Sequence, residues 1–470
     1  MSDPTPVPAE TRYDSGDVEQ LLYEKRQKIY PREVHGLFAR LRTLSVIVLL
    51  GLFYGCAWLQ WDGRQAILWD LPERKFYIFN LIFWPQDFVY LALMLILAGL
   101  SLFFFTAIAG RLWCGYACPQ TVWTESFLWI ERMIEGDRSA QMRLDKSPWT
   151  FRKLGIKFSK HGIWLLFSLY TGLTFVGYFT PVRELTTEFL SFSMGPWETF
   201  WVFFYGFATY GNAGWMREQV CIYMCPYARF QSAMFDKDTM IVSYDTARGE
   251  PRGPRAKKLA HREAGLGDCI DCGFCKQVCP TGIDIRNGLQ YECISCSACI
   301  DACNFVMDNM GYQTGLIRYT TEREMEGKES RLLRPRIYIY GAALILITIG
   351  LIISIFLRVP LDLDIIRDRN KLYRETSEGL IENVYTLKII NKDIIEHEYA
   401  LSATGIKDLQ LILDTPVISV KSGEVADITL RIRADEFNLP DRSNPLTFKI
   451  TSKQDETLSI EKEARFLGPG

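Results

Sequence analysis

The sequence predicts a polytopic α-helical membrane protein with an inserted cysteine-rich domain and a C-terminal β-sandwich. Three observations lead to this fold class: five long apolar stretches, eight cysteines in a doubled pattern, and an alternating β-branched tail. Aromatic residues make up 13% of the 470 residues and include 12 tryptophans, as expected for a membrane protein with interfacial belts. The net charge of −2 gives no support for a nucleic-acid partner.

Five stretches are long enough to cross a bilayer, which takes roughly 20 residues. They lie at 43–61, 88–110, 162–182, 199–216 and within 335–357. The connection 111–160 carries nine lysines and arginines, whereas 62–87 carries three and 183–198 carries one. By the positive-inside rule, the basic connections, the N-terminus and the segment 217–336 face the cytoplasm, and the chain after the last stretch faces the periplasm. We therefore expect a multi-pass protein of a bacterial inner membrane, in contact with lipid.

Eight cysteines follow the spacing C-x2-C-x2-C-x3-C twice, with 13 residues between the two runs. Such a run holds three corners of one cubane iron–sulfur cluster, and its fourth cysteine reaches the other cluster. We expect one [4Fe-4S] cluster on Cys269, Cys272, Cys275 and Cys303, and a second on Cys293, Cys296, Cys299 and Cys279. Zinc or disulfides would need a different spacing or an oxidising compartment. The pattern therefore favours a cytoplasmic, bacterial-type 2[4Fe-4S] ferredoxin domain of the α+β class that transfers electrons.

Two C-x3-C-Pro motifs directly follow the second and fourth stretches, so both are expected at the cytoplasmic membrane face. Their cysteines are Cys114 and Cys118, and Cys221 and Cys225. Cysteines four positions apart share one face of a helix, so two neighbouring pairs could offer four thiolates to one soft metal such as copper. The alternative is structural, because buried cysteine packs as a small apolar side chain and a proline can start a helix. Two motifs beside an electron-transfer domain favour the metal or redox role.

Beyond the last stretch, β-branched residues alternate with polar ones, as at 384–390, 418–420, 428–432 and 446–450. Alternation with turn residues every eight to twelve positions or so predicts a small antiparallel, Ig-like β-sandwich. The predicted domains are a cytoplasmic segment (1–42), a membrane domain (43–240), a ferredoxin domain (241–334), a last membrane helix (335–357) and a periplasmic sandwich (358–470).

This order of stretches, thiol motifs, cysteine runs and tail resembles the CcoG/FixG/RdxA family, membrane polyferredoxins that are accessory proteins of cbb3-type cytochrome c oxidase. The distinctive strings are LWCGYACPQ at 112–120, IVSYD at 241–245, RGEPRG at 248–253 and NVYTLK at 383–388. Related polyferredoxins of nitrate and nitrous-oxide respiration lack the tail. Asn304 departs from the usual ferredoxin pattern, in which proline often follows the fourth cysteine.

The resemblance implies an oxidoreductase, a cupric reductase that converts Cu(II) to Cu(I) during oxidase assembly, with the four thiols of the C-x3-C-Pro motifs as its catalytic and copper-binding residues. It also implies a cytoplasmic electron donor, and copper chaperones, an exporting ATPase or oxidase assembly factors as partners. Self-association stays open. Two other functions also stay open: a quinol-linked electron conduit, and a non-catalytic copper chaperone or assembly scaffold.

Overall fold

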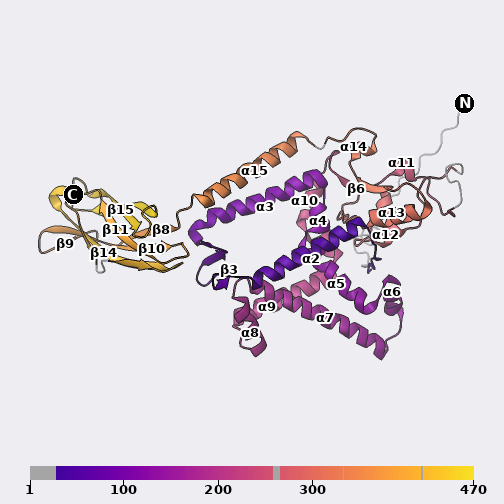
Figure 1. Ribbon diagram of the computed structural model, residues 1–470, viewed down its shortest axis with the longest axis horizontal. Coiled ribbons are helices and arrows are strands. Elements are labelled where there is room, and N and C mark those ends of the chain that lie inside the picture. The colour runs from indigo at the N-terminus through magenta and orange to yellow at the C-terminus, as the bar shows by residue number, and fades with distance from the viewer. Residues whose placement is uncertain (1–27, 258–264, 332, 414–416, 470) are drawn as a thin grey trace, which may run out of the picture.

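The computed structural model describes residues 28–257, 265–331, 333–413 and 417–469, so the first 27 residues of the predicted cytoplasmic segment lie outside it. Long helices connect two different ends of the molecule (Figure 1). The C-terminal β-sandwich lies at one end, and the cysteine-rich segment lies at the other. The long helices therefore separate the two polar domains from each other.

Three helices of the described residues are long and apolar enough to cross a membrane. They are α2 (Leu37–Trp58), α3 (Phe88–Ala109) with the turn before it, and α15 (Pro335–Phe356). Most of their large apolar side chains are exposed, as expected for a surface that faces lipid. The stretch predicted at 43–61 is shifted: the helix starts at Leu37, and Gln60–Trp61 already form a strand that turns back at Asp62.

The third and fourth predicted stretches form helices of another kind. The stretch at 162–182 belongs to α7 (Phe151–Val176), which starts earlier in a basic segment and ends before the predicted limit. The stretch at 199–216 forms α9 (Pro196–Thr209) and then a π-helical segment, η2 (Tyr210–Met216). A Cβ atom on Gly172 of α7 would collide with the α9 backbone, so this glycine lets the two helices approach closely. Five spans stay a prediction, of which three helices meet the requirements of length and hydropathy.

Short elements surround these helices at both ends. At the cysteine-rich end lie α4 (Leu112–Tyr116), α5 (Pro119–Glu135), α6 (Arg138–Lys146), the π-helical η3 (Val220–Met224) and α10 (Pro226–Met234). At the sandwich end lie β1 (Gln60–Trp61), β2 (Arg64–Gln65), β3 (Ile67–Asp70), β4 (Lys75–Ile78), β5 (Leu81–Phe83), η1 (Pro85–Asp87) and α8 (Val182–Ser191).

The cysteine-rich segment is closed by β6 (Ile241–Tyr244) and β7 (Ile317–Thr320), which pair antiparallel. Between them lie α11 (Thr246–Gly249), α12 (Phe274–Gln277), η4 (Ile285–Asn287) and α13 (Ala298–Met310), and α14 (Glu322–Met325) follows β7. The carboxylate of Asp301 in α13 accepts hydrogen bonds from the backbone N–H groups of Phe38 (3.3 Å) and Ala39 (2.7 Å). These N–H groups start α2 and have no partner within the helix, so Asp301 attaches the segment to the first membrane helix.

The C-terminal domain is an antiparallel β-sandwich, as predicted. One sheet has the order β12-β14-β10-β8 with β9 also paired to β10, and the other has the order β13-β11-β15-β16. The strands are β8 (Leu361–Arg367), β9 (Arg374–Glu375), β10 (Leu380–Asn391), β11 (His397–Thr404), β12 (Gln410–Leu413), β13 (Ile418–Val420), β14 (Val425–Asp435), β15 (Ser443–Ser452) and β16 (Ser459–Leu467). Leu387, Ile432, Phe448 and Phe466 are fully buried between the sheets.

The sandwich rests on the small sheet formed by β3, β4 and β5. Ile390 of the sandwich packs with Ile82 and Trp84. Asp87, just before α3, pairs with Arg358 at 2.7 Å and with Lys392 at 3.0 Å. Apolar packing and these half-buried ion pairs therefore fix the sandwich to the ends of the membrane helices.

The opposite placement of the two domains predicts the behaviour of topology reporters. A fusion after Gly470 should be active as a periplasmic alkaline phosphatase, and an insertion near Arg255 should fluoresce as a cytoplasmic protein, because lysine and arginine concentrate on the cytoplasmic side. A cytoplasmic signal from the C-terminal fusion would mean that the number of spans is even.

Candidate iron–sulfur and thiol site

Two small cavities in the cysteine-rich segment divide its eight cysteines. One cavity is lined by Cys269, Cys272, Cys275 and Cys303. The other is lined by Cys279, Cys293, Cys296 and Cys299, with Cys275 at the boundary. Cys303 lies with the first run although it ends the second, and Cys279 lies with the second run although it ends the first. We name these groups the outer set and the inner set. Four sulfurs around each cavity fit the ligand requirement of a cubane cluster.

The two sets have loops of the same conformation, which reflects the repeated spacing. The residues before and after the second cysteine of each run adopt left-handed backbone angles: Asp271 (φ 53°), Gly273 (φ 65°), Ser295 (φ 53°) and Ser297 (φ 61°). Left-handed residues bend the chain sharply and occur singly at functional loops. The bends wrap each loop around its cavity and bring its cysteines to face one point.

The sets differ in their exposure. Cys272 of the outer set is exposed, whereas Cys296 of the inner set is buried under the membrane helices. Burial raises the pKa of the Cys296 thiol, and the guanidinium of Arg42 opposes this effect by favouring the thiolate. The outer set can therefore be approached from solvent, and the inner set faces the membrane domain.

The four thiols of the C-x3-C-Pro motifs come together at the inner set. Cys114 is held by α4 and Cys221 by η3, while Cys118 and Cys225 each precede the proline that starts a helix, α5 or α10. Burial raises the pKa of the Cys114 thiol to about 12, and the nearby thiols of Cys118, Cys221 and Cys225 contribute to the rise. Burial also raises the pKa of the Cys221 thiol to about 12, again with Cys118 and Cys225 as neighbours. The thiols of the two motifs are therefore neighbours, and we name these four side chains the thiol cluster.

The four thiols are neighbours, but they are not arranged with the geometry of a metal site. Within the part of the chain that the structure describes, no three Cys, His, Asp or Glu side chains are arranged to hold a single metal ion. The Cys114 thiol donates a hydrogen bond to the side-chain oxygen of Gln231 at 3.2 Å. Binding of a soft metal would have to displace thiol protons and exchange this hydrogen bond for a metal–sulfur bond.

Two residues that sequence reasoning did not single out attach the thiol cluster to the inner set. A Cβ atom on Gly115 would lie 2.8 Å from the carbonyl oxygen of Ile294 and 3.0 Å from the Cα atom of Cys296. The buried guanidinium of Arg111 donates to the backbone carbonyls of Tyr291 and Ala228. The first motif, the second motif and the inner loop therefore meet at one point. One indication of their importance is visible in the sequence: Gly115 lies inside the first C-x3-C-Pro motif, and Arg111 lies just before it.

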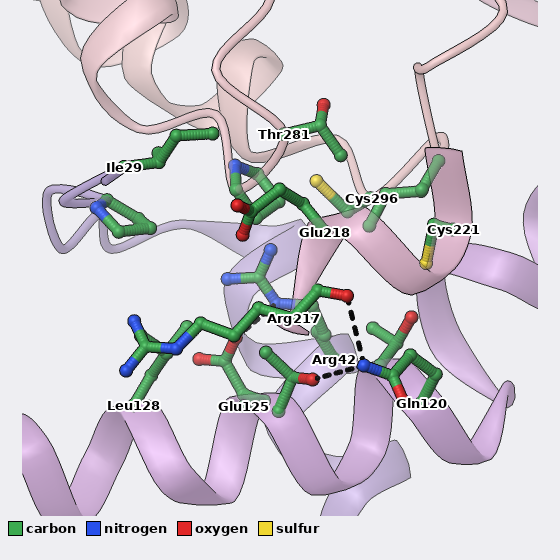
Figure 2. Close-up of a pocket in the computed structure, with 15 residues that line it drawn as sticks. Ile29, Arg42, Gln120, Glu125, Leu128, Arg217, Glu218, Cys221, Thr281 and Cys296 are labelled. Atoms are coloured by element: carbon green, nitrogen blue, oxygen red, sulfur yellow. Dashed lines mark hydrogen bonds and ion pairs between the residues drawn. The ribbon is translucent and has the colours of Figure 1, made fainter. Parts of the chain in front are cut away.

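Figure 2 shows the small cavity between these parts, with Cys221 and Cys296 on its upper side. Below it, Gln120 of α5 donates from its side-chain nitrogen to the backbone carbonyl of Arg217 at 3.0 Å. This bond connects the helix after the first motif with the segment before the second. The cavity therefore lies between the thiol cluster and the inner set.

The sequence matches three family models. One is described as a 4Fe-4S dicluster domain (residues 216–322), one as a 4Fe-4S binding domain (90–135), and one as an IG-like fold at the C-terminus of FixG (351–469). The nitrogen fixation protein FixG of Rhizobium meliloti is 37% identical over 467 residues, which cover 92% of this chain and 87% of that protein. The protein RdxB of Cereibacter sphaeroides is 43% identical over 420 residues, which cover 86% and 88% of the two chains.

The chain belongs to the FixG/RdxA family. Similarity also extends to the ferredoxin-type protein NapH of Haemophilus influenzae, at 23% identity over 224 residues that cover 45% of this chain and 66% of NapH. A crystal structure of a FixG-related protein from Vibrio parahaemolyticus matches 24% of this chain and 98% of its own, with 36% identity and a TM-score of 0.22. The family and its dicluster domain make this chain a [4Fe-4S] electron-transfer protein with an Ig-like C-terminal domain.

The close contact at Gly115 can be tested by adding one methyl group. Gly115→Ala should displace the loop that carries Cys296 and lower the iron content from about eight towards about four per chain, since only the inner set is affected. Gly99→Ala is the matched control, because a Cβ atom there meets nothing within 4 Å. Iron analysis and EPR of the reduced protein provide the measurement. Unchanged iron and spectra in Gly115→Ala would show that the loop is not held by this contact.

The crossed grouping predicts which cluster a single substitution removes. Cys303→Ser should abolish the same EPR signal as Cys272→Ser, because both cysteines line the outer cavity. Cys299→Ser, one helical turn away on α13, should abolish the other signal instead. The assignment is wrong if Cys303→Ser and Cys299→Ser remove the same signal.

Proposed function

We propose that the protein reduces Cu(II) to Cu(I) at the cytoplasmic face of a bacterial inner membrane, and that it supplies copper during assembly of a cbb3-type oxidase. In this proposal, the outer and inner sets each hold one [4Fe-4S] cluster, which supplies one-electron transfer when bound. A cytoplasmic donor approaches the outer set, where Cys272 is exposed. Copper is the substrate, and one electron converts each Cu(II) ion to Cu(I).

The observation that carries the proposal is the meeting of four thiols beside the inner set. Thiolate sulfur prefers Cu(I), zinc or iron–sulfur clusters to harder ions. A site with Cys114, Cys118, Cys221 and Cys225 would therefore hold the product of the reduction more firmly than the substrate. The contact of Gly115 with the inner loop supports this proposal, because it brings the first motif against the loop that carries Cys296.

The partners in this proposal follow from its location. The N-terminus and both cysteine sets are cytoplasmic, and the Ig-like sandwich is periplasmic. Cu(I) would pass to a copper chaperone and an exporting ATPase, while the sandwich would contact oxidase assembly factors or a second copy of this chain. Membrane lipid surrounds the helices.

Mixing the reduced protein with Cu(II) tests the reaction. We expect the visible absorption of the clusters to recover as Cu(I) forms, with one Cu(I) ion per electron, detected by an anaerobic Cu(I)-specific chelator. A protein that binds copper while its clusters stay reduced would be a copper chaperone or scaffold. Quinol-dependent reduction of the clusters without copper turnover would support an electron conduit instead.

A second role for the four thiols has an observation in its favour. The family model described as a 4Fe-4S binding domain covers residues 90–135 and therefore Cys114 and Cys118. Four thiols can also hold a cubane cluster. Iron analysis of anaerobically purified protein separates the two roles, because three cubanes need about twelve irons per chain and two cubanes need about eight.

Paired substitutions test the shared copper site. Cys114→Ser with Cys118→Ser should abolish tight Cu(I) binding while about eight irons per chain remain, because these thiols lie outside the two cysteine sets. Cys221→Ser with Cys225→Ser should have the same effect, because half of the thiolates cannot keep the full affinity. Cys56→Ser, inside α2, is the control and should bind copper normally. Full copper affinity in either double variant would make that pair structural.

A further inference from the structure

A large pocket lies beside the thiol site, and the copper reaction does not use it. It has a volume of about 630 Å³ and lies between α5, α7 and the π-helical segment η2. Its lining combines five charged side chains with aromatic ones, among them Trp149, Phe158, Trp164 and Trp215. The volume is in the range of pockets that hold small organic molecules, and its aromatic walls suit a flat ring.

The inner wall of the pocket contains buried charges that neutralise one another. Glu131 pairs with Arg217 at 2.8 Å and with Lys160 at 3.3 Å, and Lys160 also pairs with Glu135 at 2.7 Å. Burial alone would raise the pKa of Glu131, but Arg217 and Lys160 hold it below its ordinary value. The carboxylate is therefore ionised, and both of its oxygen atoms are engaged by these cations.

His161 stands at the same wall between two tryptophans. Its ring stacks on Trp215 at 5.8 Å and meets Trp164 edge-on at 5.2 Å. Its Nδ1 atom shares a hydrogen bond of 2.9 Å with the hydroxyl of Tyr210. Burial and the adjacent Lys160 and Lys157 lower the pKa of His161, which favours the neutral imidazole.

The rim of the pocket is apolar and open. Trp149 is 73% exposed, and Phe158 is 77% exposed, although both are large apolar side chains. The amine of Lys153 lies 4.9 Å from the centre of the Trp149 ring and holds it at the polar boundary. Exposed aromatic residues next to lysine are typical of the membrane interface. A ligand could therefore enter from the lipid phase.

The pocket is adjacent to the electron-transfer site. Arg217 lines this pocket and also the small cavity of Figure 2, which contains Cys221 and Cys296. The pocket and the cavity that contains Cys221 and Cys296 therefore share part of a wall. An amphipathic aromatic ligand with exchangeable protons and electrons fits these three properties: aromatic walls, a neutral base and a neighbouring electron acceptor.

We propose that this pocket binds the ring of a membrane quinol and is a second point of electron entry, in addition to the cytoplasmic donor. The inference goes beyond the proposed copper reaction. Oxidation of the quinol to the quinone breaks its two O–H bonds and releases two electrons and two protons. One proton passes to the imidazole of His161 and the other to water at the open rim. The dicluster domain, with its two [4Fe-4S] clusters bound, would supply the two one-electron acceptors that this oxidation requires.

Binding is tested without electron transfer. A fluorescent quinol analogue that cannot be oxidised, 2-heptyl-4-hydroxyquinoline N-oxide, should bind the purified full chain once and lose its fluorescence. His161→Phe and Trp149→Ala should raise its dissociation constant by about tenfold, as expected for loss of one hydrogen bond or one aromatic contact. The matched control is Trp197→Ala, a similarly exposed tryptophan at the start of α9 that should leave binding unchanged.

Electron transfer is then measured from the reduced protein to a quinone, because this direction requires no assumption about the reduction potentials of the clusters. Dithionite-reduced protein is mixed with menadione, and recovery of the cluster absorption is followed. We expect His161→Phe and Trp149→Ala to slow this recovery about tenfold relative to Trp197→Ala. Equal rates in all variants would place the reaction at the exposed outer set and overturn the proposal.

Binding of phosphatidylglycerol vesicles that displaces the quinoline would overturn it too, in favour of a lipid headgroup site. Cupric reduction by dithionite-reduced variants is independent of the pocket, so it tests the proposed function separately.

Discussion

The position of the electron-transfer site depends on a backbone contact between the first thiol motif and the inner loop. Gly115 has no side chain, and the loop that ends in Cys296 occupies the space a Cβ atom would need. Beside it, the guanidinium of Arg111 is buried, and its N–H donors need hydrogen-bond acceptors there. The carbonyls of Tyr291 and Ala228 supply them, one from the inner loop and one from the helix after the second motif. One contact therefore determines where three distant segments meet.

The sequence predicted the parts of the fold that a regular spacing determines. A fixed interval between cysteines and a period of two in the tail both follow from local geometry, so the dicluster domain and the sandwich could be predicted without a structure. The pocket could not be predicted in this way. The polar face of α5 is visible in the sequence, but whether Glu131 meets water, lipid headgroups or a cation depends on Arg217, 86 residues away. Sequence periodicity contains no information about that partner.

The number of membrane spans shows the same limit. Hydropathy identifies α2, α3 and α15 because they are apolar on all sides. In α7, the apolar part continues a basic segment, and Lys153 and Lys160 of that segment are buried against polar partners rather than placed in solvent. The two halves of the helix therefore differ in polarity. The first half contributes to the ion-pair wall of the pocket, and the second half packs on α9. Among the described residues, α7 is therefore not one of the three helices that are apolar enough to cross a membrane by hydropathy.

The chemistry of the two proposed substrates gives a reason for two clusters in one domain. A quinol releases two electrons, whereas Cu(II) accepts one, so a protein that connects them needs a place for the second electron. Cys296 of the inner set and Cys221 of the thiol cluster line one cavity, and Arg217 lines both this cavity and the pocket. The outer set is separated from them and, through Cys275, borders the inner cavity. A cluster held there would supply a place for the second electron, and the exposed Cys272 would be its point of contact with solvent. The crossed cysteines connect the two sets through the backbone. Cys279 ends the first run but lines the inner cavity, and Cys303 ends the second run but lines the outer cavity.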